Sequence, residues 1–122
     1  MHFLACGPLT PAVTDALRRH GHQVHTPGEI HVPPEATPPD VLAAAQTRQW
    51  DIVTADPVLA GAPHQACLPF SRCIVFLQLP ASDLEHDHAI DRLFNRYKRL
   101  STSRLYTITT TRVKIRQLPH PP

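Results

Sequence analysis

The sequence lacks long apolar runs and has only three cysteines among its 122 residues. No stretch approaches the roughly 20 apolar residues that a membrane-spanning helix requires, and the apolar opening at residues 2–6 is too short for the core of a signal peptide. An odd number of cysteines at low density disfavours the disulfide framework of small secreted domains. We therefore expect a cytoplasmic protein, with no membrane association, whose fold does not depend on disulfides.

Internal repeats are also absent, and the composition excludes a disordered or fibrous chain. Hydrophobic residues make up 42% and charged residues 18% of the sequence, which is ordinary for globular domains. Proline is enriched, with 14 residues, yet most prolines fall between periodic segments or in the first turn of expected helices, where a missing N–H matters little. The length argues for one domain, which we place at residues 1–118, followed by a Pro-rich tail at 119–122.

Acidic residues are missing from the end of the chain. Residues 92–122 contain eight Lys or Arg and no Asp or Glu, a net charge of +8, whereas residues 1–91 contain four Arg and all ten acids, a net charge of −6. The overall charge of +2 hides this separation. Such a basic segment could attract phosphate, an acidic partner, or the acidic part of its own fold.

Hydrophobic periodicity predicts an α/β fold. Strands and helices alternate up to residue 100, which predicts a mostly parallel central sheet with flanking helices, ending in a C-terminal hairpin. The most apolar run, at 73–79, is typical of a central strand covered on both faces. Residues 57–71 are rich in glycine and proline and favour irregular structure with one short helical turn. We expect strands at 3–6, 22–26, 51–55, 73–79, 105–109 and 112–117, and helices at 11–20, 38–50 and 82–100.

The end of the first strand and the end of the third strand are the candidate site. Cys6 ends the first expected strand, and Asp56 follows the third, directly before Pro57. Ligands of parallel α/β sheets collect beyond the carboxyl ends of the strands. We therefore expect Cys6, Asp56 and the loops after them at one edge of the sheet.

Four segments together resemble a known family. They are Leu-Arg-Arg-His-Gly-His-Gln-Val at 17–24, a helix that opens at 37–42, Asp-Ile-Val-Thr-Ala-Asp at 51–56, and the paired ending at 104–106 and 112–116. This pattern resembles the small stand-alone bacterial PIN-like proteins, which are related to the PIN-domain toxins of toxin–antitoxin pairs. The resemblance spans nearly the whole chain and implies a PIN-like α/β domain.

The resemblance implies a cluster of three or four carboxylates that hold Mg²⁺ or Mn²⁺ and orient water for attack on an RNA phosphodiester. Carried over residue by residue, Asp56 and Asp40 are the acids that remain, as catalytic residues and metal ligands. The positions of the other family acids are occupied in this sequence by Cys6, Gly7, Pro38, Pro39 and Val58. The Cys6 thiol is neutral and soft and is therefore a poor ligand for Mg²⁺, so we expect any metal to bind weakly.

The resemblance therefore implies a toxin-type, metal-dependent ribonuclease with a depleted acidic site. The alternative is a catalytically inactive PIN-like module that binds RNA or a protein partner, such as an antitoxin-like protein, through its basic C-terminal surface. A third hypothesis is an oligomerising structural protein, and a homodimer is among the expected assemblies.

Each candidate side chain at the sheet edge also has a purely structural interpretation. Asp56 could cap the turn before Pro57. Asp40 lies in the first turn of an expected helix, where the helix dipole favours negative charge whatever the function. Cys6 could be a buried thiol rather than a nucleophile, because no histidine is tied to it by spacing.

The basic residues form two expected stripes. Three arginines recur at helical spacing from residue 92, and three cations alternate along the last strand. If exposed, they would bind phosphates by counterion release; the alternatives are a solvated face, or charges answered by residues 1–91 or by an acidic partner. The residues assigned to nucleic-acid binding are Arg92, Arg96, Arg99, Arg112, Lys114 and Arg116.

Histidine and cysteine suggest one further, weaker site. His64, Cys67 and Cys73 have the soft-ligand composition that suits Zn²⁺, but a fourth ligand at recognisable spacing is missing. His86 falls on the apolar face of its expected helix and His88 on another side, so packing and surface roles are expected for them.

Overall fold

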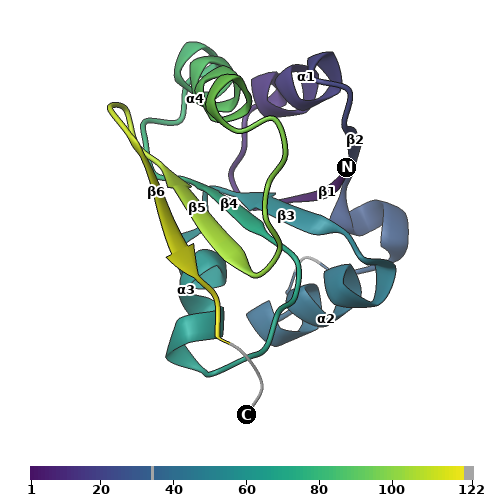
Figure 1. Ribbon diagram of the computed structural model, residues 1–122. Helices are drawn as coiled ribbons and strands as arrows, with labels where there is room; N and C mark the ends of the chain where they lie inside the picture. The colour runs from purple at the N-terminus through teal and green to yellow at the C-terminus, as the bar shows by residue number, and fades with distance from the viewer. Residues whose placement is uncertain (34, 120–122) are drawn as a thin grey trace.

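The computed structural model describes residues 1–33 and 35–119 and contains one six-stranded sheet (Figure 1). The strand order is β2-β1-β3-β4-β5-β6. Strands β1 to β5 are parallel to one another, and β6 is antiparallel to β5. The expected α/β fold with a mostly parallel sheet and a C-terminal hairpin is confirmed. The strands are β1 (His2–Cys6), β2 (Gln23–His25), β3 (Asp51–Thr54), β4 (Ile74–Leu77), β5 (Arg104–Ile108) and β6 (Val113–Gln117).

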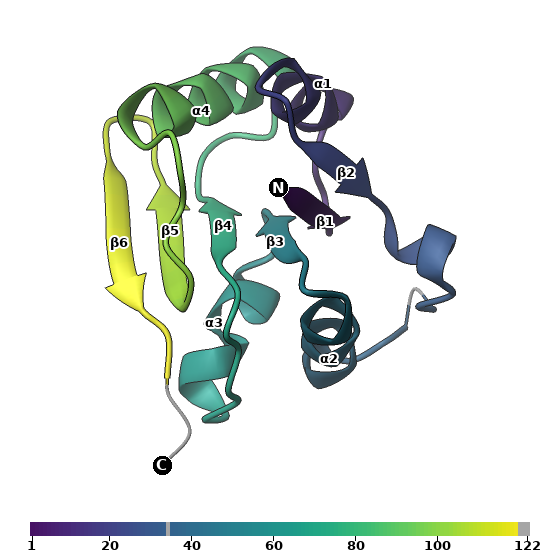
Figure 2. The ribbon, with the colours of Figure 1, turned by 45° about the vertical axis from the view of Figure 1, so that its right-hand side comes forward.

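Four α-helices cover the two faces of the sheet. α1 and α4 pack together on one face, and α2 and α3 lie on the other (Figures 1 and 2). Each face has its own apolar core, because alternate residues of each strand point to opposite sides. β3 and β4 are central and buried along most of their length, as predicted for the most apolar run. The helices are α1 (Pro11–Arg19), α2 (Pro38–Arg48), α3 (Pro57–Gln65) and α4 (Asp83–Arg96), with a 3₁₀ turn η1 (Pro27–Ile30).

Proline begins three of the helices. Pro11, Pro38 and Pro57 occupy the first position of α1, α2 and α3, each after a residue in extended conformation. Proline suits this position because its fixed φ is helical and the N–H that it lacks has no partner within the helix. The Thr-Pro pairs before the first two helices therefore gave correct starting points.

The prediction for residues 57–71 was wrong, because α3 is a nine-residue helix rather than a short turn. Gly61 and Pro63 have a low intrinsic propensity for helix, which is why the local sequence argued against one. In the fold, Leu59, Ala60 and Ala62 are buried against the sheet. Burial of this apolar surface outweighs the weak propensity, and Asp56 caps the first turn.

The helix expected up to residue 100 ends earlier. α4 stops at Arg96, and Tyr97 has an extended conformation. The Tyr97 ring packs edge-on against the Tyr106 ring at 5.8 Å between centroids, and the Tyr106 hydroxyl accepts a hydrogen bond from the backbone N–H of Ser101. These contacts with β5 turn the chain away from the helix axis, so Arg99 does not belong to the helical stripe predicted for it.

Among the residues that the structure describes, no helix has the length and apolar character to cross a membrane. Most of the expected Pro-rich tail, residues 120–122, lies outside the described residues.

Candidate functional site

A hollow of about 460 Å³ lies at the carboxyl edge of the sheet. It brings together Cys6, Gly7 and Asp56, as expected for the ends of the adjacent strands β1 and β3. Gly7 has a φ of +82°, and a Cβ there would lie 3.1 Å from Thr54 Oγ1 and 3.2 Å from Asp56 Cβ, so only glycine fits this close approach. The rest of the lining is mostly apolar: Pro27, Val32, Pro33, Ala36, Pro38, Val41, Val58 and Leu59.

The Asp56 carboxylate serves its own helix. Its Oδ1 accepts a hydrogen bond from the Val58 backbone N–H at 2.9 Å, which is the N-cap interaction of α3. The Asp56 backbone N–H donates to Thr54 Oγ1 at 3.0 Å. The capping role foreseen for Asp56 is therefore present, while its side chain still borders the hollow.

Asp40 is not among the residues that line this hollow. It lies exposed in the first turn of α2, where Thr37 Oγ1 donates a hydrogen bond to its Oδ2 at 3.0 Å. Both acids that the sequence resemblance singled out lie at helix N-termini. The structure does not bring them together in one cavity.

Cys6 is buried, with 6% of its surface exposed, and its Sγ donates to the Leu4 carbonyl at 3.8 Å. Burial, together with the negative charge of Asp56, raises the pKa of the Cys6 thiol to about 12. The sulfur is therefore protonated at neutral pH and is neither a nucleophile nor a ligand for a hard cation. Within residues 1–33 and 35–119, no three His, Cys, Asp or Glu side chains are grouped to hold a metal ion.

The absence of a metal-binding group among the described residues also argues against the zinc hypothesis. The backbone N–H of buried Cys73 donates to Asp51 Oδ1 at 2.9 Å. Cys67 is exposed, and His64 Nε2 lies 2.9 Å from the Gln117 carbonyl. These three residues have separate structural environments and do not form a common site.

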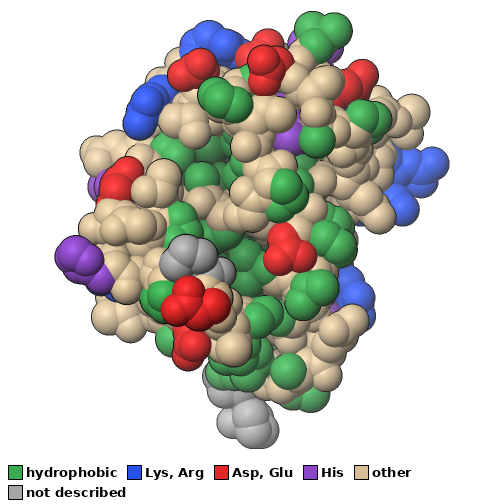
Figure 3. Space-filling view, turned by 180° about the vertical axis from the view of Figure 1, so that it is seen from behind, with side chains coloured by type: hydrophobic (Ala, Val, Ile, Leu, Met, Phe, Trp, Pro, Cys, Tyr) green, Lys and Arg blue, Asp and Glu red, His purple; other side chains and the backbone are tan. Residues whose placement is uncertain are grey.

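The face opposite to that of Figure 1 presents mainly hydrophobic side chains at its centre, and its carboxylates are scattered around them rather than gathered in one cluster (Figure 3). An acidic cluster would be needed to hold a divalent cation through oxygen ligands. At the carboxyl edge, Asp56 is the acid among the described residues that line the hollow, which falls short of the carboxylate set that the resemblance implies.

A second hollow, of about 390 Å³, lies between α4 and the turn of the β5–β6 hairpin. Three of the predicted cations, Arg92, Arg96 and Arg112, line it with no acidic residue. Arg92 is held in place because its guanidinium donates to the Thr109 carbonyl at 2.7 Å, and the Arg96 guanidinium lies 5.4 Å from the centre of the Tyr97 ring. The other lining residues, which the sequence did not single out, are Asn95, Thr111 and Val113.

The remaining predicted cations lie elsewhere. Arg99 is exposed in the segment after α4. Lys114 pairs with Thr107 and Arg116 with Leu105 across the hairpin. Because paired residues share a face of the sheet and Leu105 belongs to the core under α2 and α3, Lys114 and Arg116 project on that side. The basic surface is therefore two surfaces, one beside α4 and one on the opposite face of β6.

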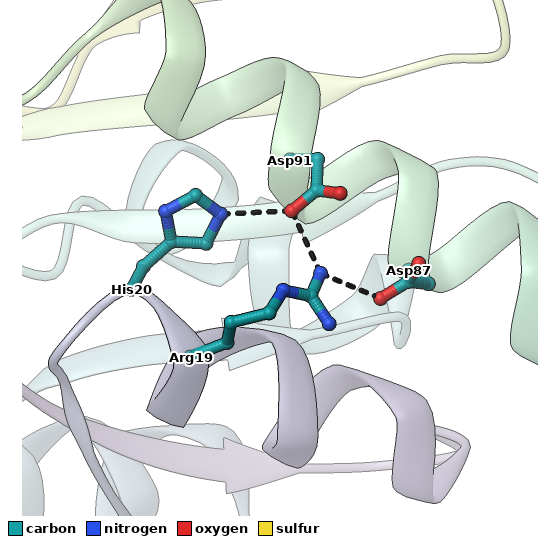
Figure 4. A network of polar contacts seen from close by, with 4 residues as sticks. All are labelled: Arg19, His20, Asp87 and Asp91. Atoms are coloured by element: carbon teal, nitrogen blue, oxygen red, sulfur yellow. Dashed lines mark hydrogen bonds and ion pairs between the residues drawn. The ribbon is translucent and has the colours of Figure 1, made fainter.

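Glu85 and Asp91 line an adjoining hollow that also includes Arg92 and Asn95, and Asp87 and Asp91 are engaged with α1. Arg19 contacts the carboxylates of Asp87 and Asp91, each at 2.8 Å, and His20 Nε2 lies 2.8 Å from the same Asp91 oxygen (Figure 4). The guanidinium of Arg19 lowers the pKa of Asp91, and His20 adds to the effect. This network joins α1 to α4 and leaves Arg92, Arg96 and Arg112 without an ion-pair partner among the described residues.

His86 occupies the apolar face of α4, as predicted, and is fully buried. Its Nδ1 accepts from Thr10, with 3.1 Å to the hydroxyl and 3.4 Å to the backbone nitrogen. Its Nε2 has no hydrogen-bond partner among the described residues. Burial lowers the pKa of His86, so the ring is neutral at pH 7 and serves packing rather than proton transfer.

Comparisons of the chain with protein-family models, with curated proteins and with solved structures find no match in any of the three. The α/β architecture is established by the strand order and pairing given above.

Proposed function

We propose that this chain is a PIN-like module that binds RNA through its phosphates, in the hollow lined by Arg92, Arg96 and Arg112, and does not cleave it. The observation that carries the proposal is the convergence of these three cations, from α4 and from the hairpin turn, around one cavity that contains no acid. The PIN-like identity is part of the proposal and rests on the sequence resemblance.

The chemistry of the lining suits a phosphodiester. A guanidinium offers several N–H donors in a planar fork that matches phosphate oxygens. Asn95 and Thr111 add neutral hydrogen-bonding groups at the same hollow. Since Arg92 is already oriented by the Thr109 carbonyl, less side-chain freedom is lost when a phosphate binds.

The metal-ligating groups at the carboxyl edge of the sheet do not support cleavage. The hollow there offers one carboxylate, which caps α3, and one protonated thiol. Mg²⁺ and Mn²⁺ prefer several oxygen ligands, so these residues do not fit the metal that the family resemblance implies. We derive no hydrolytic step from them.

Binding is tested by the fluorescence anisotropy of a labelled single-stranded RNA across a salt series. The affinity of the wild-type protein is expected to fall as salt rises. In an Arg96→Ala/Arg112→Ala variant, we expect affinity about tenfold weaker at low salt and a salt slope smaller by about 1.4, since each phosphate contact on a single strand contributes roughly 0.7. Arg18→Ala, an exposed change on α1, is the matched control and should behave as wild type.

Two results would overturn the proposal. A flat salt response, or equal affinity in the double variant, would remove the phosphate contact. Incubation of RNA with Mn²⁺ tests cleavage: degradation that stops with EDTA and is lost in Asp56→Asn would replace binding by the ribonuclease alternative. Asn is chosen because it retains a side-chain oxygen that can cap α3.

A further inference from the structure

Within the described part of the chain, no strand pairs with the outer edge of β6. β6 ends the sheet order, and its pairing with β5 fixes which of its backbone groups point outward. The Thr109 N–H donates to the Arg112 carbonyl, and hydrogen-bonded pairs alternate along an antiparallel ladder. It follows that Lys114 and Arg116 bond to β5, whereas the N–H and C=O groups of Val113 and Ile115 point away from it.

The side chains along this edge alternate in character. Ile115 is 45% exposed on the side of α4, where its cross-strand neighbour is Tyr106. Lys114 and Arg116 are exposed on the opposite side of the strand, and none of the described carboxylates forms an ion pair with either. The edge therefore offers main-chain hydrogen-bonding groups, one apolar contact and two unanswered positive charges in a regular order.

A second copy of this chain fits the edge poorly. Antiparallel self-pairing through the outward groups places either Lys114 opposite Lys114, or Lys114 opposite Arg116, of the other copy. Like charges directly opposite each other destabilise a strand pair. Cations on an edge strand are also a known protection against edge-to-edge aggregation, so the same residues that exclude a copy of the chain favour a strand of opposite charge.

We propose that β6 receives an extended acidic segment of a partner protein, which adds to the sheet as a seventh strand. The outward groups of Val113 and Ile115 bond to its main chain, an apolar side chain covers Ile115, and the flanking Asp or Glu residues lie against Lys114 and Arg116. An extended peptide matches the spacing of backbone donors and acceptors on an edge strand, which a phosphate backbone does not. Of the edge residues, Val113 also borders the hollow of Arg92 and Arg96, whereas Lys114 and Arg116 project on the opposite face, so the inference goes beyond the proposed function and does not depend on it.

The probe is a synthetic peptide in which Glu alternates with Val, and its binding to the full chain is measured by calorimetry and by amide hydrogen exchange. We expect binding that protects the amides of Val113 and Ile115. A peptide with Lys in place of Glu, and one of the same composition with the alternation scrambled, should not bind. Absence of binding by the alternating acidic peptide, or equal binding by the scrambled one, would overturn the proposal.

The charge-reversed variant Lys114→Glu/Arg116→Glu gives the sharpest test. We expect it to lose at least about tenfold in affinity for the acidic peptide, from two cross-strand pairs of the usual strength, and to bind the Lys peptide instead. Because both residues are exposed, far-UV circular dichroism should be unchanged. If the charge-reversed variant still preferred the acidic peptide to the Lys peptide, the assigned contacts would be contradicted.

RNA and a second copy of this chain are the two competing occupants of the β6 edge, and the same variants separate them. If Lys114→Glu/Arg116→Glu loses RNA affinity as strongly as Arg96→Ala does, and the acidic peptide does not bind, the edge is an RNA surface and the proposal fails. If sedimentation shows a wild-type dimer that becomes a monomer in Ile115→Lys, the edge is occupied by a second copy. Loss of RNA binding in Arg96→Ala alone bears only on the proposed function.

Discussion

Residues 1–91 and residues 92–119 use their charges in opposite ways. In the first region, several charged groups are engaged within the fold, among them Asp51 with Arg72, Asp56 with the start of α3, and Asp91 with Arg19. In the second region, no Lys or Arg forms an ion pair with a described carboxylate. The two net charges, −6 and +8, therefore differ in what their side chains do. The first includes charges that stabilise the fold, whereas the second consists of cations that are available to a ligand.

The two hollows repeat this contrast at similar size. The hollow at the carboxyl edge contains one carboxylate, already bonded to the α3 backbone, among apolar side chains. The hollow beside α4 contains three guanidinium groups and no acid. Substitutions in the first region should therefore change the free energy of unfolding, and substitutions of the second region's cations should change binding.

The largest expected effect is at Asp51. This carboxylate is 1% exposed, accepts from the Cys73 N–H at 2.9 Å and lies 3.4 Å from the Arg72 guanidinium. We expect Asp51→Ala to lower the free energy of unfolding by about 3 kcal/mol, because it leaves a buried N–H and a partly buried cation without a partner. Chemical denaturation measures the change, and Arg116→Ala is the matched control from the second region. Equal stability of the two variants would break the comparison.

The next effect, about 1 kcal/mol, is expected at Asp56. Asp56→Ala removes the side-chain acceptor that caps α3, and loss of an N-cap destabilises a protein by roughly that amount. Asp56→Asn keeps an acceptor oxygen and should remain close to wild type. Denaturation midpoints of the two variants check this, and an Asn variant as unstable as the Ala variant would show that the negative charge, rather than the cap, stabilises this end of the sheet.

Sequence reasoning recovered the parts of the fold that depend on local chemistry. Thr-Pro pairs placed the starts of α1 and α2, and alternation placed the strands within a residue or two. α3 was missed because Gly61 and Pro63 argue against a helix locally, while the burial of Leu59 that stabilises it depends on the sheet. The end of α4 was missed because Tyr97 leaves the helix to pack against Tyr106.

The candidate sites were predictable to a different extent. Their places at the carboxyl ends of expected parallel strands predicted that Cys6 and Asp56 would meet at one edge, and the structure brings them to the same hollow. Spacing could not predict that Arg112 would join Arg92 and Arg96, because that contact depends on how the hairpin packs beside α4. Helical spacing also joined Arg99 to these residues, and the early end of α4 removed it.

The smallest expected effect concerns two histidines of α4, one buried and one exposed. His86 is buried and its pKa is lowered, mainly by desolvation and partly opposed by Asp83, whereas His88 is exposed. Below the ordinary histidine pKa of about 6.5, the unfolded chain takes up protons more readily than folded His86 does. The free energy of unfolding should therefore decline as pH falls from 7 to 5.

Denaturation at each pH should show a weaker decline in His86→Gln, and His22, whose pKa is also lowered by burial, should supply the remainder. His88→Gln is the matched control for the substitution itself, because His88 is exposed on the same helix. If stability declined as steeply in His86→Gln as in the wild-type protein, burial of His86 on the apolar face of α4 would not be the cause of the pH dependence.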